Sequence, residues 1–190
     1  MAGHGAAGAK MVVRIHPAAL TEIEMEIKTE LEKLSKEGLV DLTGSLAWND
    51  AFGCFTRAGF EKLVWPQIGE KAEWIIYFDI NGMHALNELH GSYDPVDAMI
   101  KNVLAVTRAT DFVAGQWKSG DEFLVCVTQA DDRAPVDPQG MVNRLAAEMQ
   151  KQGLSATFAI VPVVSWKLAE NVEPAIREVY AAKKARGVSR

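Results

Sequence analysis

The sequence predicts an α/β fold, an α+β sandwich in which helices flank a central mixed sheet. Two observations lead to this prediction. Hydrophobic residues make up 48% and charged residues 24% of the 190-residue chain, which is typical of a globular protein with a sizeable core. Short apolar runs alternate with segments of helical period. The run at 73–80 has no polar alternation, as in a central strand that is covered on both faces.

The bulk composition narrows the class of protein. The formal net charge of -5 argues against a nucleic-acid surface, so we expect no DNA or RNA partner. No stretch approaches the roughly 18 apolar residues of a membrane span, so we expect no membrane partner. Cys54 and Cys126 lack metal-type spacing and are typical of buried cysteines in a reducing compartment. Residues 1–16 lack the apolar core of a signal peptide and are predicted to be disordered or tag-like, which favours a cytoplasmic protein.

Residues 17–40 have the pattern of an N-terminal helix. Pro17 suits a first helical turn, and Gly38 suits the end of the helix. Apolar residues recur at steps of three and four, at Leu20, Ile23, Ile27, Leu31 and Leu34. We favour an amphipathic helix that packs on its own domain. The alternative is a short two-chain coiled coil that supports a homodimer.

Residues 41–190 are predicted to form one domain. A loop-like stretch at 41–50 precedes a helix at 56–65 that ends at Pro66. The remaining elements are, in order, the strand at 73–80, helices at 84–89 and 95–108, two strands joined by a polar turn at 115–120, a surface loop at 128–140, a helix at 141–151, a strand at 155–164 and a helix at 172–185. Pro162 in the last strand indicates an edge position or a bulge.

Carboxylates lie at the ends of two apolar strands. Asp79 ends the run "IIYFD", and Asp121 and Glu122 precede the run "FLVCV". If these strands are neighbours, the carboxylates converge, and like charges that lie close together need a cation between them. Magnesium held by two carboxylates and substrate phosphates is common in phosphoryl and nucleotidyl transfer, and Gly120 lets the backbone approach phosphate. The alternative is that Asp79 caps the next helix and the acidic pair forms a hairpin turn. The occurrence of both features on apolar strands favours the metal site.

Five ordered blocks of sequence carry a family resemblance. "FDINGMHALNELHG" and "RATDFVAGQWKSGDEFLV" resemble the GGDEF domain of diguanylate cyclases, whose pattern is FDIDxFKxINDxxGH, then RxxD, then GGDEF before an apolar strand. "DAFGCFTRAGFEK", "SATFAIVPVV" and "VYAAKKARG" resemble the family's opening, later strand and closing motifs, so the similarity spans residues 50–187. The resemblance implies a palm-like nucleotidyl cyclase fold with a central five-stranded mixed sheet. It also implies condensation of two GTP molecules into cyclic di-GMP by a magnesium- or manganese-dependent homodimer.

The resemblance also assigns roles by position. It implies that Asp79 and Asp121 bind the metal together with the carbonyl of Ile80. Glu122 would assist metal binding or proton transfer from the 3′-hydroxyl. Further expected contacts are Asn87 with the guanine edge, Lys183 with the terminal phosphates, and the Ser119-Gly120 turn with substrate.

The chain departs from the family pattern at several of these positions. Ser119 replaces the first glycine of the signature, Asn81 replaces the second aspartate of FDID, and His84 replaces a lysine that contacts phosphate. The aspartate that reads the base corresponds to Asp97 displaced by one place, to Asp94, or to no carboxylate, with Val96 in its position. These three alternatives leave the choice between guanine and adenine open.

Arg108 and Asp111 fit the RxxD pattern that binds cyclic di-GMP as a product inhibitor in many relatives. The same pattern is common at the end of a helix, where arginine is favourable. The chain between Asp111 and Asp121 is also longer than the family pattern. We therefore favour the helix-end interpretation.

Three functions follow from these observations. The first, which we favour, is a divergent diguanylate cyclase-like nucleotidyltransferase that acts on purine nucleoside triphosphates, GTP above all. The second is a degenerate domain that binds GTP or a cyclic dinucleotide and signals by dimerising. The third is a scaffold without a ligand. Nucleotide binding without pyrophosphate release distinguishes the second function from the first.

Overall fold

The computed structural model describes residues 28–129 and 137–187. The chain divides into two compact units, residues 1–42 and 43–190. The predicted N-terminal stretch at 1–16, residues 17–27 of the predicted helix, residues 130–136 of the predicted surface loop and residues 188–190 of the predicted domain lie outside the described residues. Within the described residues, no helix is both long and apolar enough to cross a membrane.

The prediction of one N-terminal helix over residues 17–40 is wrong within the described part. Residues 28–32 are helical, the chain turns at 33–34, and a second helix, α2, spans Lys36–Ala47. Ser35 starts this helix, because its Oγ accepts the N–H of Gly38 at 3.1 Å, as an N-cap residue does. Gly38 therefore lies in the first turn of α2, and most of the stretch predicted as a loop at 41–50 is helical.

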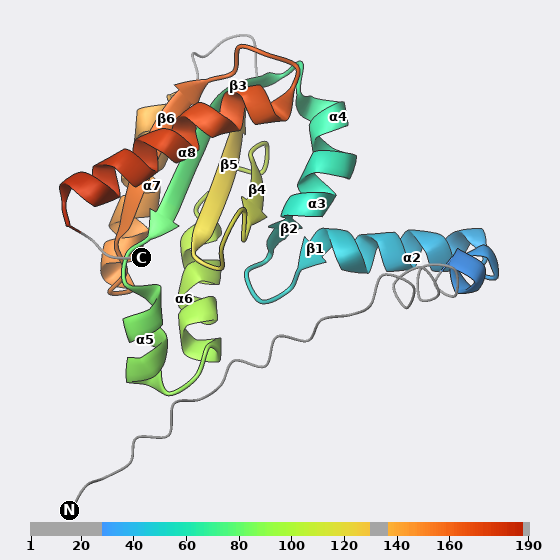
Figure 1. The fold of residues 1–190 in the computed structure, drawn as a ribbon, viewed down its shortest axis with the longest axis horizontal. Helices are drawn as coiled ribbons and strands as arrows, with labels where there is room; N and C mark the ends of the chain where they lie inside the picture. The colour runs from blue at the N-terminus through green and yellow to red at the C-terminus, as the bar shows by residue number, and fades with distance from the viewer. Residues whose placement is uncertain (1–27, 130–136, 188–190) are drawn as a thin grey trace, which may run out of the picture. The chain divides into compact units, whose positions relative to one another are not determined.

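The central sheet is mixed, as predicted, and has six strands among the described residues (Figure 1). Its strands in spatial order are β1 (Trp48–Asn49), β2 (Cys54–Thr56), β4 (Phe112–Gly115), β5 (Glu122–Thr128), β3 (Ala72–Ile80) and β6 (Ala156–Pro162). β2 and β4 are parallel, and every other neighbouring pair is antiparallel. The sixth strand corrects the expected five. The β1–β2 hairpin is too short to give a periodic pattern, and β2 ends where a helix was expected to begin.

Helices cover both faces of the sheet. The helices after β2 form one continuous path, α3 (Arg57–Gly59), the π-helical segment η1 (Phe60–Val64) and α4 (Trp65–Ile68). The prediction that this helix ends at Pro66 is wrong. The wider π turn, in which the N–H of Trp65 donates to the carbonyl of Phe60, lets the chain continue through Pro66. The other helices are α5 (Met83–His90), α6 (Asp94–Leu104), α7 (Pro138–Lys151) and α8 (Leu168–Ala185).

Two of these helices have ends that the sequence pattern did not locate. α6 ends four residues before the expected position, where the hydroxyl of Thr107 donates to the carbonyl of Leu104 at 2.8 Å. α7 begins earlier than expected, because Asp137 caps it by accepting the N–H of Gly140 at 2.8 Å. Such boundaries depend on single side-chain contacts, which a hydrophobic period does not report.

The two core clusters lie on opposite faces of the sheet and share β3. Ile76 and Phe78 pack in the cluster that contains residues of α6 and α7. Ile75 and Tyr77 pack in the cluster that contains residues of η1 and α8. All four residues are fully buried, which confirms that β3 is a central strand covered on both faces. β6 lies at the edge of the sheet, where Pro162 was expected.

Candidate active site

The two acidic strand ends meet at one edge of the sheet. β3 and β5 are antiparallel neighbours, and their register pairs Asp79 with Glu122. The N–H of Ile80 donates to the carbonyl of Asp121 at 2.9 Å, which joins the end of β3 to the turn before β5. A cavity of about 350 Å³ opens here, lined by Asp79, Lys118, Ser119, Asp121, Glu122 and Tyr180. The condition on which the metal-site prediction depended, that the two strands are neighbours, is therefore met.

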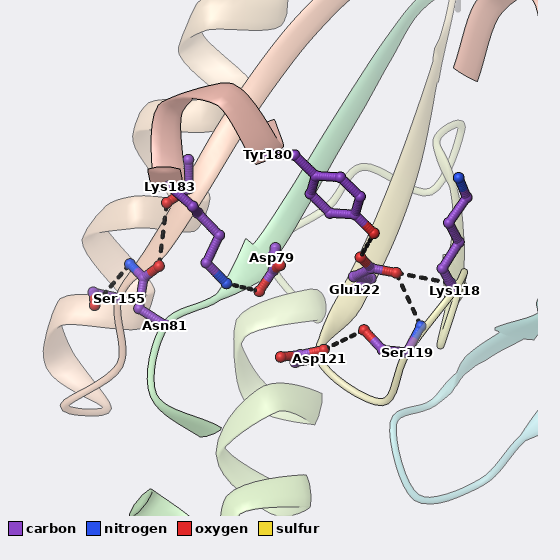
Figure 2. Close-up of polar contacts among 10 residues, drawn as sticks. Asp79, Asn81, Lys118, Ser119, Asp121, Glu122, Ser155, Tyr180 and Lys183 are labelled. Carbon is purple, nitrogen blue, oxygen red and sulfur yellow. Dashed lines mark hydrogen bonds and ion pairs between the residues drawn. The ribbon is translucent and has the colours of Figure 1, made fainter. Parts of the chain in front are cut away.

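Asp79 is a buried carboxylate with a buried cationic partner. Its side chain is 5% exposed, and its Oδ1 forms an ion pair with the ammonium of Lys183, which is 8% exposed (Figure 2). Burial raises the pKa of Asp79, and the hydrogen bond from Lys183 opposes this rise. The nearby charges of Asp121 and Glu122 raise the pKa further, so that it lies above the ordinary value. The carboxylate therefore depends on a cation to stay ionised.

The alternative role for Asp79, as the cap of the next helix, is wrong. The N-cap residue of α5 is Gly82, which has a left-handed backbone and makes no side-chain capping bond. The side chain of Asp79 instead bonds to Lys183 on α8. The first turn of α5 consequently begins without a capping side chain, and N–H groups in that position favour anions such as phosphate.

Glu122 holds the turn that precedes its own strand. Its Oε2 accepts the backbone N–H groups of Lys118 and Ser119, each at 2.9 Å, and its Oε1 accepts the hydroxyl of Tyr180 at 2.5 Å (Figure 2). The residue is only 2% exposed, so these three donors replace the water that the carboxylate loses. Glu122 thus fixes the shape of the turn.

Two tyrosines near Glu122 were not identified from the sequence. Tyr180 lies on α8, three residues before Lys183, and helical residues at this spacing share one face. That spacing was the available signal, since Lys183 had been assigned to the site. The buried hydroxyl of Tyr77 has no hydrogen-bond partner among the described residues. Burial and the charge of Glu122 raise the pKa of Tyr77 above its ordinary value.

The turn at residues 118–121 forms the exposed rim of the cavity. The hydroxyl of Ser119 donates to Oδ1 of Asp121, so the side chain that replaces a glycine turns toward the carboxylate. A side chain at Gly120 would meet no atom within 4 Å, so the backbone there is open to solvent. Asp121 is partly exposed and is the most accessible of the three acids.

Asn81 uses both ends of its side-chain amide. Its amide nitrogen donates to Oγ of Ser155 at 3.2 Å, and its carbonyl oxygen accepts the hydroxyl of Thr157 at 3.1 Å. The amide makes both contacts without a charge. Asn81 therefore ties the end of β3 to the start of β6 instead of adding a charge to the acidic cluster.

The residues expected to bind the base lie on α5 and α6, outside the acidic cavity. The buried Oδ1 of Asn87 has no partner among the described residues. Asp97 is half-buried, and burial together with nearby Asp94 raises its pKa. Val96 is fully buried in the core, so it cannot contact a ligand. Of the three candidate positions, Asp94 is exposed, Val96 is buried and Asp97 is a half-buried carboxylate.

The remaining predicted residues make polar contacts within the fold. Nε2 of His84 lies 3.2 Å from Oε1 of Glu88 on the surface of α5. Arg108 donates to both carboxylate oxygens of Asp111, at 2.8 and 2.7 Å, and to the carbonyl of Thr128 at 3.1 Å. Asp111 also accepts the N–H of Thr128 at 3.3 Å. The contacts of Arg108 and Asp111 support a structural role for the RxxD segment after α6.

The acidic residues fit a cation that takes much of its coordination from substrate. Within residues 28–129 and 137–187, no three His, Cys, Asp or Glu side chains are arranged to hold a metal. Asp79 and Asp121 offer carboxylate oxygens, which are hard donors, in the same cavity. Magnesium is commonly bound by one or two carboxylates together with substrate phosphates and water. These donors therefore fit magnesium or manganese when a triphosphate is present.

A larger cavity, of about 610 Å³, lies at the opposite end of β3, among residues that precede this strand and residues at the start of α8. Trp65 and Trp166 line it, and the indole N–H of Trp65 donates to the carbonyl of Trp166 at 2.8 Å. None of the acids discussed above lines it. The chemistry is therefore assigned to the smaller cavity.

Comparisons with known proteins identify the fold. No protein-family model matches the sequence, and no curated protein matches it. A microbial GGDEF domain described with cyclic di-GMP is 17% identical with a TM-score of 0.59, and the match covers 76% of this chain and 94% of that chain. The chain has the fold of a GGDEF domain. The predicted fold class is thereby confirmed.

Two further GGDEF structures match a larger share of the chain. The coiled coil and GGDEF domain of DgcB from Caulobacter crescentus, in complex with c-di-GMP, is 17% identical over 88% of this chain and 95% of that chain, with a TM-score of 0.59. The diguanylate cyclase SiaD from Pseudomonas aeruginosa, in complex with its activator SiaC, is 16% identical over 88% and 74%, with a TM-score of 0.59. At these identities the likeness concerns the GGDEF fold.

Proposed function

We propose that this GGDEF-fold chain is a divergent nucleotidyltransferase of the diguanylate cyclase type. It condenses two purine nucleoside triphosphates, GTP above all, into a cyclic dinucleotide and releases pyrophosphate. The observation that carries the proposal is the convergence of Asp79, Asp121 and Glu122 with the buried ammonium of Lys183 at one edge of the sheet. The similar solved structures, which include a diguanylate cyclase and complexes with c-di-GMP, support the same reaction class.

The reaction requires one type of step, carried out twice. The 3′-hydroxyl oxygen of one nucleotide attacks the α-phosphorus of the other, the bond from that phosphorus to the pyrophosphate oxygen breaks, and the hydroxyl proton passes to a base. Asp79, Asp121 and the Ile80 carbonyl would hold magnesium or manganese, which neutralises charge on the phosphates. Lys183 places a positive charge on the terminal phosphates. Glu122 keeps the turn at the α-phosphate in place, and positioning of this kind supplies much of the catalysis.

Hydrogen-bond acceptors on α5 and α6 favour guanine. Asp97 is a half-buried acceptor on α6. Asn87 is half-buried on α5, and its Oδ1 is shielded from solvent and has no partner among the described residues, so this oxygen reaches a base once the side chain turns outward. Guanine presents a ring N–H and an amino group side by side, which are donors for two such acceptors. Adenine offers only its amino group to the same pair. A homodimer is part of the proposal, because each copy would hold one triphosphate and two must meet.

A binding module is the second candidate function, and two observations favour it. The buried carboxylates Asp79 and Glu122 are both bonded within the protein. His84, which stands in place of the family's phosphate-contacting lysine, lies beside Glu88. A domain of this kind would bind GTP or a cyclic dinucleotide and leave triphosphates intact.

The test is mass spectrometry of the products. Purified protein is incubated with GTP, ATP or both, with magnesium or manganese, at concentrations high enough for dimers. The Asp121→Asn variant removes a partly exposed carboxylate of the site, and Asp50→Asn removes an exposed carboxylate outside it as a matched control. We expect a cyclic dinucleotide and pyrophosphate from the wild type and the control, and none from Asp121→Asn. Intact triphosphates in every sample, with GTP binding seen by calorimetry, would favour the binding module. Equal product from both variants would refute the proposed site.

A further inference from the structure

One face of α8 supplies a donor to each of two carboxylates that lie side by side. Tyr180 donates to Glu122, and Lys183, one turn later, is bonded to Asp79. Asp79 and Glu122 are register partners across β3 and β5. Figure 2 shows both side chains of α8 pointing from the helix toward these strand ends. A single helix thus covers both buried acids of the candidate site.

The Lys183 ammonium is placed where a metal ion would have to bind. It contacts an oxygen of Asp79, a carboxylate that the proposed function assigns to the divalent cation. Both side chains are less than a tenth exposed, so water does little to compensate either charge. A metal ion at Asp79 would therefore meet a positive charge already bound there, and like charges at that distance repel.

We infer that Lys183 is a built-in competitor of the divalent cation, so that the cation and the triphosphate bind to this site as a coupled pair. In the nucleotide-free protein the ammonium occupies Asp79. A bound triphosphate offers it another partner, and its flexible four-carbon side chain can reach that partner without movement of the helix. Asp79 is then released to the metal. This inference rests on the proposed function, because it uses a triphosphate as the alternative partner of Lys183.

Tyr180 explains why the exchange needs no rearrangement of α8. Its hydroxyl bonds to Glu122, whose other oxygen holds the backbone of Lys118 and Ser119. These contacts keep α8 against the turn whether Lys183 is bound to Asp79 or to phosphate. Only the lysine side chain moves. By thermodynamic linkage, the factor by which nucleotide improves metal affinity equals the factor by which metal improves nucleotide affinity.

The test is a titration of Mn²⁺ alone into the metal-free protein at about pH 8, followed by calorimetry. Lys183→Met removes the competing charge and keeps an unbranched side chain that is one atom shorter, and Lys184→Met removes an exposed neighbouring charge as a matched control. We expect Lys183→Met to bind Mn²⁺ about tenfold more tightly than the wild type, within the 5–150-fold range usual for coupled sites. Lys184→Met should match the wild type. A Lys183→Met variant that binds Mn²⁺ equally or more weakly would overturn the inference.

The coupling itself is measured with a non-hydrolysable GTP analogue. The wild type and Lys184→Met should bind Mn²⁺ several-fold more tightly when the analogue is present. Phosphate oxygens that coordinate Mn²⁺ directly contribute to this gain in every variant, so Lys183→Met should show a smaller gain than the other two proteins. If the analogue improves Mn²⁺ affinity by the same factor in all three proteins, Lys183 does not couple the two ligands.

A measurement on the wild type covers the case in which Lys183→Met does not fold. Lysine ammonium groups that are buried in ion pairs can be observed by NMR with ¹⁵N-labelled lysine. We expect the signal of Lys183 to persist when Mg²⁺ is added alone and to shift when Mg²⁺ and the analogue are added together. Loss of the ion-pair signal with Mg²⁺ alone would overturn the inference.

The failure of this inference and the failure of the proposed function have different signatures. Metal titration reports on Lys183 and Asp79 whether or not a product forms. Tighter Mn²⁺ binding by Lys183→Met in a protein that never makes a cyclic dinucleotide would support the inference and refute the enzyme. Product from the wild type, with unchanged Mn²⁺ affinity in Lys183→Met, would support the enzyme and refute the inference.

Discussion

The chain has three tyrosines, and replacement of each by phenylalanine has a different expected effect on stability. Tyr180→Phe removes one hydroxyl that donates to the buried carboxylate of Glu122. Hydrogen bonds to charged groups contribute about 1.5–3 kcal/mol. Glu122 keeps its two backbone donors, so we expect a loss near the lower end, about 2 kcal/mol in the free energy of unfolding. The ring stays in place, so no cavity adds to this value.

The other two tyrosines are the matched controls. Tyr93 is 68% exposed, and Tyr93→Phe should change the free energy of unfolding by less than about 0.5 kcal/mol. The hydroxyl of Tyr77 is buried without a partner among the described residues. Because an unsatisfied buried polar group is unfavourable, Tyr77→Phe should stabilise the protein by up to about 1 kcal/mol. The three substitutions each remove one hydroxyl group. The free energy of unfolding should fall for Tyr180→Phe, stay nearly unchanged for Tyr93→Phe and rise for Tyr77→Phe.

The assay is urea unfolding of the metal-free proteins, monitored by fluorescence and circular dichroism. A shift of the midpoint at constant slope reports a change in stability and not in the denatured state. The reasoning is refuted if Tyr180→Phe is within about 0.5 kcal/mol of Tyr93→Phe. It is also refuted if Tyr77→Phe is as unfavourable as Tyr180→Phe, since Tyr77 would then be the residue that binds Glu122.

Two further predictions concern a pair of glycine substitutions and the two buried cysteines. A side chain at Gly59 would lie 2.6 Å from Cα of Ala47 and against its carbonyl, so Gly59→Ala should destabilise by about 2 kcal/mol. Gly44→Ala, which meets no atom within 4 Å, should stabilise by about 0.5–1 kcal/mol in the same urea assay. Burial raises the pKa of Cys54 and Cys126 to about 12, so neither should be alkylated at about pH 8 until the protein unfolds. Because the folded state keeps these protons longer, the free energy of unfolding should fall as pH rises above about 9, and rapid alkylation of the folded protein would contradict the assignment.

The parts of the fold that the sequence predicted have strong local signals. β3 is a continuous apolar run that needs no knowledge of its neighbours to be identified. Asp79 lies near the end of this run, and Asp121 and Glu122 lie at the start of the second apolar run, which forms β5. Once the two strands are identified, the positions of the acids at their ends are known. The register that pairs Asp79 with Glu122 then brings them together, as expected for adjacent strands.

The features that the sequence missed depend on contacts between distant residues. Tyr180 bonds to a residue 58 positions away, and Lys183 to one 104 positions away. No periodicity reports such pairs. The start of α2 escapes the sequence pattern for a different reason. Gly38 fits the stop signal of a helix, whereas Ser35 caps a new helix there. The β1–β2 hairpin was missed because two very short strands have no detectable alternation.

The buried charges are a physical argument for function over a purely structural role. Burial raises the pKa of Asp79 above its ordinary value even with Lys183 beside it, so the fold holds this carboxyl group in a place that disfavours its charge. Buried ion pairs can often be replaced by apolar residues of similar volume with no loss of stability, or with a gain. A scaffold would therefore gain little from Asp79 and Lys183. A site that exchanges this ammonium for a metal ion requires both.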